Sequence, residues 1–302
     1  MKIKGVFAAP FLMIVVLALF GASSLLETET PAVGGNPYLT LTVVQLIVYA
    51  LPSVFFCRMR GKGYTKRLRM RFFSPRHLFL LFFALLAMLA GSALLNLLMV
   101  SLFPEGDFSG ASGGYAAASG DVLRMLYVVL AFCILPALLE EFLFRGIMAA
   151  EYESVSVPCA VCMSALLFAM MHLSFVRLPA YFFSGVILAL TMYATRSVFA
   201  SMLVHAANNV AALWLERYFY TAAAETGDQG VLLIFVLLCV LFVSLILFAM
   251  SAQRIYTGYG VTNTPSPHVH KRKRGDTGAV EAIAAPPFLL LVVLFIIFTA
   301  VS

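Results

Sequence analysis

Three ionisable side chains lie within six residues of an otherwise apolar stretch, the segment EEFLFR at residues 140–145. Charged side chains inside a membrane are costly, usually face a partner or a water-filled cavity, and are therefore candidates for function. Glu141 and Arg145 are four residues apart on one helix face, where we expect a supporting ion pair. Glu140 points about 100° away from Glu141 and is less well placed to share that arginine. It is the free acid of the segment, and such a carboxylate can act as a general base.

Two histidines also fall within apolar runs, and each has a notable neighbour one helical turn away. Phe168 precedes His172 by four residues, and Asn209 follows His205 by four residues, so each pair shares one helix face. A single intramembrane histidine often only hydrogen-bonds a neighbouring helix. Two such pairs in one chain weaken that interpretation and favour a functional site.

The composition places these residues in a membrane protein. Of 302 residues, 62% are hydrophobic and only 11% are charged, which leaves too little polar surface for a soluble domain of this length. Long apolar runs that do not alternate favour membrane helices over a barrel. We therefore predict an all-α, polytopic transmembrane bundle of about eight or nine helices. The apolar runs are 6–25, 38–57, 78–103, 122–150, 156–175, 178–195, 197–214, 231–252 and 286–301.

The links between the runs predict the orientation. Residues 58–76, here called the basic segment, hold eight Lys or Arg and no acid, and the link 253–285 carries KRKR at 271–274. Because basic links favour the cytoplasmic side, we expect a cytoplasmic N-terminus and a multi-pass protein of the plasma membrane. Arg177, in a short link assigned to the outside, is the exception. Contact of the basic links with an anionic leaflet explains the net charge of +6, so the lipid bilayer is an expected partner and nucleic acid is not.

The chain is expected to have three parts and no separate soluble domain. Residues 1–121 hold three spans and the basic cytoplasmic loop, residues 122–214 hold the ionisable core, and residues 215–302 hold the last spans and a basic linker. Residues 106–121 are expected to form a low-complexity outer loop. The first apolar run has features of a signal peptide, but its length favours a retained span.

Simple helix geometry brings the candidate residues to one level. We expect one helix over 122–153, bent near Pro136, followed by an antiparallel partner. With a rise of 1.5 Å per residue, Glu140 and His172 then lie at nearly the same height above the connecting turn. His205 joins them if this hairpin projects about 10 Å into the cytoplasm.

Polar residues near the turn, namely Arg145, Glu151 and Glu153, suit such a projection. The three candidate side chains are then expected to share a site in the cytoplasmic half of the membrane.

The motifs, in this order on successive predicted spans, resemble the CPBP family of intramembrane proteases, which includes the CAAX endopeptidases and the Abi-type immunity proteins. EEFLFR matches EExxxR, FAMMH at 168–172 matches FxxxH, and HAANN at 205–209 matches HxxxN. Pro136 ahead of the acidic pair is also common in that family. The resemblance covers roughly residues 122–214.

The resemblance implies hydrolysis of a peptide bond in a membrane-associated peptide or membrane-protein substrate. It assigns Glu140 and His172 to the activation of water, and His205 and Asn209 to stabilisation of the oxyanion. The supporting residues are then Glu141, Arg145 and Phe168.

The role of a metal stays open at this point. Glu140, His172 and His205 could together bind zinc, and proteins of this kind are often labelled metalloproteases. The chain has no HExxH motif, however, and Glu141 is the only further carboxylate nearby. We therefore favour a reaction that depends on the glutamate and uses no cofactor.

A non-catalytic membrane scaffold, or a binding protein of the bacteriocin-immunity type, is the alternative to an enzyme. Transport is a third class, because buried carboxylates and histidines also relay protons. Transporters more often show broken helices in repeated halves, which are not evident here. A scaffold would not need all of Glu140, His172, His205 and Asn209, and all four are present.

Overall fold

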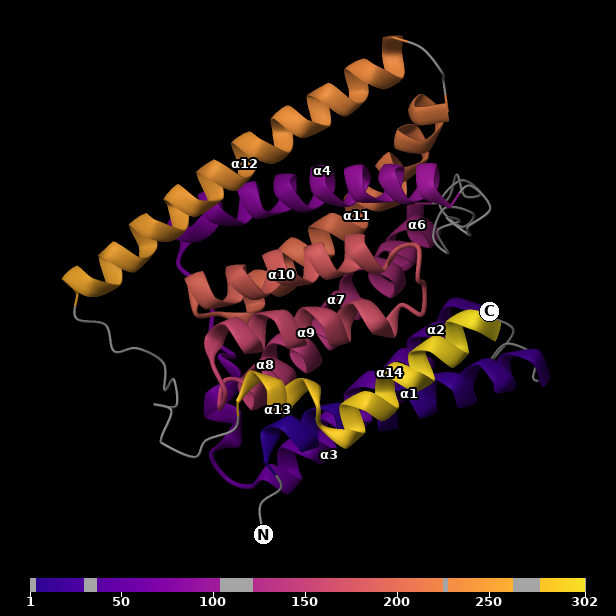
Figure 1. Cartoon of the computed structure of the whole chain (residues 1–302), viewed down its shortest axis with the longest axis vertical. Coiled ribbons are helices and arrows are strands. Elements are labelled where there is room, and N and C mark those ends of the chain that lie inside the picture. Colours follow the sequence, from indigo (N-terminus) through magenta and orange to yellow (C-terminus); the bar gives the residue numbers. More distant parts are fainter. Residues whose placement is uncertain (1–3, 30–36, 104–121, 225–227, 263–277, 302) are drawn as a thin grey trace.

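The computed structural model describes residues 4–29, 37–103, 122–224, 228–262 and 278–301. The expected outer loop at 106–121 and the KRKR run at 271–274 lie outside the described residues. All regular elements in the described ranges are helices (Figure 1). The main helices are α1 (Gly5–Glu29), α2 (Pro37–Gln45), α3 (Leu51–Arg60), α4 (Leu78–Leu102), α6 (Val122–Val129), α7 (Leu135–Glu141), α8 (Ala149–Tyr152), α9 (Val157–Met171), α10 (Leu178–Thr195), α11 (Val198–Ala224), α12 (Asp228–Val261), α13 (Ala279–Ile283) and α14 (Pro286–Val301).

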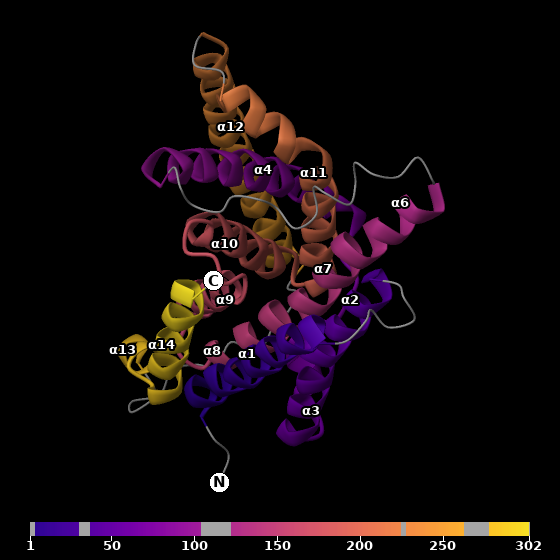
Figure 2. The same cartoon turned by 90° about the vertical axis from the view of Figure 1, so that its right-hand side faces the viewer.

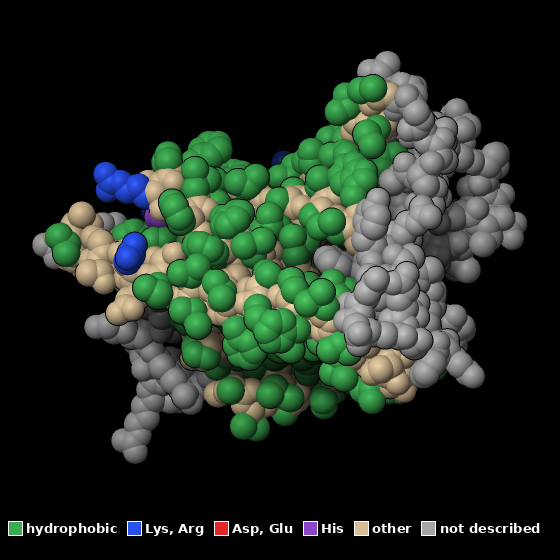
Figure 3. Space-filling view, turned by 90° about the horizontal axis from the view of Figure 1, so that it is seen from above, with side chains coloured by type: hydrophobic (Ala, Val, Ile, Leu, Met, Phe, Trp, Pro, Cys, Tyr) green, Lys and Arg blue, Asp and Glu red, His purple; other side chains and the backbone are tan. Residues whose placement is uncertain are grey.

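The described helices form a multi-pass integral membrane protein. Seven helical stretches are long and apolar enough to cross a membrane, and two shorter apolar helices, α9 and α14, bring the number to nine. The face in Figure 3 is covered mainly by hydrophobic side chains, as a lipid-facing surface should be. The prediction of an all-α polytopic bundle is therefore confirmed. Several bounds differ from the predicted ones: α9 ends at Met171, α11 continues to Ala224 and α12 continues to Val261.

Two prolines mark the places where long spans change their helical winding. Pro52 follows the π-helical segment Leu46–Ala50, and Pro136 follows the π-helical segment Leu130–Ile134. Proline has no N–H to donate and its ring crowds the preceding turn, so a local widening of the helix before it relieves the clash. A third π-helical segment, Phe142–Met148, directly follows α7, and such segments are frequent at functional sites.

The helices that carry the motifs pack around one another. Helix α10 lies between α9 and α4, and α11 packs against α4, α7 and α10 (Figures 1 and 2). Helices α9 and α10 approach closely at Gly185, where a Cβ would lie 2.9 Å from the Cα of Ala165. Helix α12 packs along α4, while α1 packs against α8 and α14. The motif helices are therefore enclosed by spans from both ends of the chain.

The turn between α8 and α9 does not present polar side chains to solvent as expected. Glu151 and Glu153 are 4% and 3% exposed, and Arg145 is fully buried. Glu153 pairs with Arg69 and accepts a hydrogen bond of 2.8 Å from the Tyr193 hydroxyl. The basic segment thus folds over this turn and neutralises its acids, which the sequence alone suggested would face the cytoplasm.

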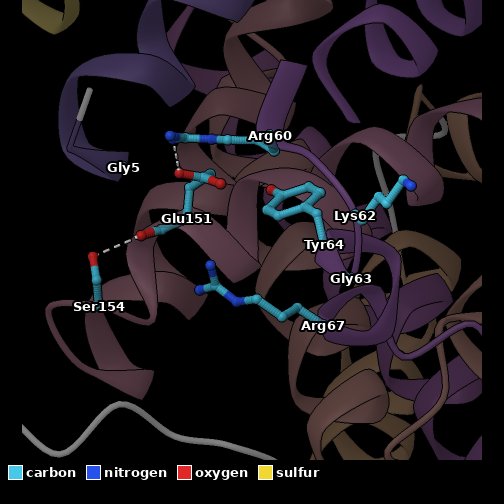
Figure 4. Close-up of a pocket in the computed structure, with 8 residues that line it drawn as sticks. All are labelled: Gly5, Arg60, Lys62, Gly63, Tyr64, Arg67, Glu151 and Ser154. Atoms are coloured by element: carbon cyan, nitrogen blue, oxygen red, sulfur yellow. Dashed lines mark hydrogen bonds and ion pairs between the residues drawn. The ribbon is translucent and has the colours of Figure 1, made fainter. Parts of the chain in front are cut away.

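Glu151 is enclosed at the same end by residues from three separate segments (Figure 4). Arg60 forms an ion pair with it. The start of α1 lies so close that a Cβ at Gly5 would be 2.5 Å from the Glu151 carbonyl oxygen. Burial, and then the charge of Glu151, raise the pKa of Tyr64 well above its usual range. This contact ties α1 and the basic segment to the stretch that carries Glu140.

Candidate active site

One cavity in the bundle collects the candidate residues. It has a volume of about 320 Å³ and lies among α4, α7, α9, α10 and α11. Glu140, His172, His205 and Asn209 all line it. Four helices and three motifs thus supply polar side chains to one enclosed space within an apolar bundle, which is the usual form of a binding or catalytic site.

The Glu141–Arg145 pair lies directly behind this cavity. Both side chains are fully buried, and Arg145 Nη1 lies 2.6 Å from Glu141 Oε1. Arg145 also donates a hydrogen bond of 3.1 Å to the Gly185 carbonyl oxygen, so it joins the stretch after α7 to α10. The ion pair expected from the spacing of the two residues is present. Buried charges of this kind need such partners to stay in place.

Glu141 has a second partner that the sequence did not indicate. Its Oε1 lies 2.9 Å from His205 Nδ1. A hydrogen bond from Nδ1–H to the carboxylate fixes the imidazole and its tautomer. His205 Nε2 then lies 3.9 Å from Glu140 Oε2, too long for a direct hydrogen bond but suited to a bridging water.

His172 closes another wall of the cavity, immediately after the end of α9. Its Nδ1 donates a hydrogen bond of 3.0 Å to the Phe168 carbonyl oxygen, so Nε2 is the nitrogen that remains for chemistry. The imidazole stacks on Tyr181 with ring centroids 3.7 Å apart and an interplanar angle of 21°. Tyr181, on the first turn of α10, therefore fixes the ring plane of His172.

Phe168 packs against both histidines from one helix face. Its ring meets His172 edge to face at 4.8 Å and His205 at 5.5 Å between centroids. The Arg145 guanidinium lies 4.5 Å from the centre of the same ring, close enough for a cation–π contact. Phe168 thus connects the buried ion pair with the two imidazoles, which suits the supporting role that the resemblance implied.

Asn209 is the fourth predicted site residue that lines the cavity, and further polar residues line it as well. The Asn209 side-chain amide lies 3.5 Å from the Cys133 carbonyl oxygen, a long contact that leaves it able to turn towards the cavity. Asn96, Asn208 and Arg177 also line the cavity. Asn96 and Asn208 were not predicted as site residues, although their position within apolar runs is a signal that could have found them. Tyr181 and Arg177 belong to no motif, so only the folded chain shows their position.

The cavity lies at the end of α9 that is remote from the turn between α8 and α9. It reaches Arg177 in the link between α9 and α10. The basic segment instead contacts α8, which leads into the other end of α9: Arg67 donates to the Ala150 carbonyl oxygen at 2.5 Å. The expected level assumed a hairpin that projects beyond the bundle. The acids of that hairpin are instead buried under the basic segment.

Residues 122–211 match the model of the family described as Rce1-like, Type II CAAX prenyl endopeptidase Rce1-like. The matched residues are less than half of the chain and contain all three motifs. Comparisons with curated proteins and with solved structures gave no match. The resemblance predicted from the motifs is confirmed: residues 122–211 are similar to a CAAX endopeptidase domain, which is consistent with the CPBP and CAAX protease family. That class supports a protease activity in general terms.

Proposed function

We propose that the protein is an intramembrane endopeptidase that hydrolyses a peptide bond of a membrane-associated peptide or protein. The single observation that carries this proposal is that Glu140, His172, His205 and Asn209 line one cavity inside the bundle. The match to a CAAX protease model over residues 122–211 supports the same class of reaction.

In this proposal, Glu140 takes a proton from a water molecule in the cavity, with His172 Nε2 orienting that water. The water oxygen attacks the carbonyl carbon of the scissile peptide bond. The proton then passes to the nitrogen of the leaving amine as the C–N bond breaks. The separation of 3.9 Å between Glu140 and His205 leaves a position between them that a water can bridge.

His205 and Asn209 stabilise the negative charge that develops on the carbonyl oxygen. The hydrogen bond from Nδ1 to Glu141 fixes the orientation of the imidazole, so that its Nε2 side faces the developing charge. Glu141 is then a positioning residue for His205 as well as the ion-pair partner of Arg145.

Asn209→Ala is expected to lower kcat by about 10²–10³ with a smaller change in KM, because an oxyanion contact acts mainly in the transition state. Steady-state hydrolysis by the purified chain in detergent or liposomes measures both constants. Leu203→Ala is a matched control, since this side chain on α11 is 48% exposed and does not line the cavity. Equal kcat for Asn209→Ala and wild type would remove Asn209 from the mechanism.

We further propose that the reaction needs no metal. Among the described residues, no three His, Cys, Asp or Glu side chains are grouped closely enough to hold a metal ion. We expect the purified protein to hydrolyse its substrate at an unchanged rate in excess chelator. Elemental analysis before and after treatment is the check. Stoichiometric zinc that is lost together with activity would show that Glu140 and the histidines act as ligands instead.

The basic segment is proposed to lie on the cytoplasmic side of the plasma membrane, together with the N-terminus. The start of α1 lies in the same pocket as Arg60 and Tyr64 of that segment (Figure 4), so both belong to one end of the bundle. The cavity then lies nearer the outer end of α9. A membrane-associated peptide is thus expected to reach the cavity within the bilayer or from the outer side.

A further inference from the structure

A second cavity lies outside the catalytic region, between the start of α4 and the end of α12. It has a volume of about 680 Å³, larger than the cavity that contains Glu140. It opens onto the surface of the helical bundle, where the Phe79 side chain is 73% exposed. The lining residues are Ser74, Arg76, His77, Phe79, Phe83, Leu247, Met250, Ser251, Arg254, Ile255, Gly258, Tyr259 and Thr262.

The chemistry of this groove changes along its length. Arg76 lies just before α4, and Arg254 and Tyr259 lie in the last turns of α12. Phe83 and Leu247 line the groove deeper in the two spans. Eleven residues separate Leu247 from Gly258 on one helix, about 16 Å at 1.5 Å per residue. The groove therefore runs from a polar end near the basic segment to an apolar end within the span.

The polar end is positively charged. Two arginines line the groove, and no Asp or Glu is among its lining residues. The guanidinium of a further arginine, Arg196, lies 3.8 Å from the ring centre of Tyr259. Figure 3 shows Lys, Arg and His side chains together at one edge of a face that is otherwise mainly hydrophobic, with no acidic side chain visible on its described part. An anionic group is the natural partner for this end.

The pocket in Figure 4 is also basic but differs in one respect. Its arginines surround the buried carboxylate of Glu151, which pairs with Arg60. That pocket already contains its anion, whereas the lining of the groove between α4 and α12 provides none.

We propose that the groove between α4 and α12 binds one anionic phospholipid. The phosphate contacts Arg76 and Arg254, and an acyl chain lies along Phe79, Phe83, Leu247 and Met250. The headgroup then lies at the charged end of the groove, which is at the end of the bundle that carries the basic segment. The acyl chain lies at the apolar end, within the span. This site is independent of the proposed protease chemistry.

The test measures binding of defined lipids to the full chain in detergent by native mass spectrometry. Phosphatidylglycerol is expected to stay bound at concentrations where phosphatidylcholine with the same acyl chains does not. The double variant Arg76→Gln/Arg254→Gln is expected to bind phosphatidylglycerol at least about tenfold more weakly, because two charges near the headgroup are lost. The matched control is Arg58→Gln, an exposed arginine of the basic segment that does not line the groove and should bind as wild type.

A second variant tests whether the groove binds the whole lipid or only an anion. Met250→Trp fills the apolar part without changing charge and is expected to weaken phosphatidylglycerol binding as well. Inorganic phosphate at equal concentration is expected not to displace the lipid. Equal binding of the two lipids, unchanged binding by the double variant, or full displacement by phosphate would each overturn the proposal.

Discussion

Glu140→Gln is expected to lower the rate of peptide-bond hydrolysis by at least about 100-fold, which is the scale of a lost general base. Glutamine keeps the size of the side chain but cannot accept a proton from water. The contact between Glu140 Oε2 and His205 Nε2 is 3.9 Å long, too long for a direct hydrogen bond. The substitution should therefore leave the fold and the amount of protein in the membrane unchanged. Hydrolysis per mole of folded protein, with purified wild type alongside, is the measurement.

The control for this prediction is Glu281→Gln. Glu281 pairs with Lys4 at 3.4 Å, and both side chains are about half exposed. Exposed ion pairs contribute little to stability, and neither residue lines the cavity, so activity and stability should both be retained. Full activity of Glu140→Gln would mean that another group activates the water.

Arg145→Met is expected to lower the stability of the folded protein by about 3–5 kcal/mol, which is the usual cost of removing one partner of a buried ion pair. Glu141 is fully buried and would lose its arginine partner, keeping the contact with His205. The hydrogen bond to the Gly185 carbonyl oxygen would also be lost. Thermal unfolding in detergent should show a clear drop in Tm, and the yield from membranes should fall with it.

The double variant Arg145→Met/Glu141→Leu separates stability from activity. Replacing both partners by apolar side chains can be nearly neutral for stability, so much of the Tm should return. Activity should stay low, because His205 no longer has the carboxylate that orients it. An Arg145→Met protein that unfolds at the wild-type temperature would contradict the role given to the buried pair.

Local features of the site could be predicted from the sequence. The Glu141–Arg145 contact depends only on the spacing of two residues along one helix. The sequence predicted a bend near Pro136, and the structure has a π-helical segment, Leu130–Ile134, directly before it, where the proline crowds the preceding turn. The motif helices were recognisable because charged and polar residues are rare within apolar spans.

Contacts between distant segments could not be predicted in this way. Nothing in the sequence says which cation of the basic segment reaches Glu151 or Glu153, because that choice depends on how the spans pack. The hydrogen bond from His205 to Glu141 and the stacking of Tyr181 on His172 arise in the same manner.

The most direct test of the central claim is a comparison of protein and peptide termini in cells that carry either the wild-type chain or Glu140→Gln. Membranes and medium are analysed by mass spectrometry at matched levels of the two proteins. We predict at least one cleavage whose new termini appear with the wild type and are lost with the variant, while the intact substrate accumulates. Identical sets of termini in the two strains would contradict the assignment of Glu140 as the base of an intramembrane protease.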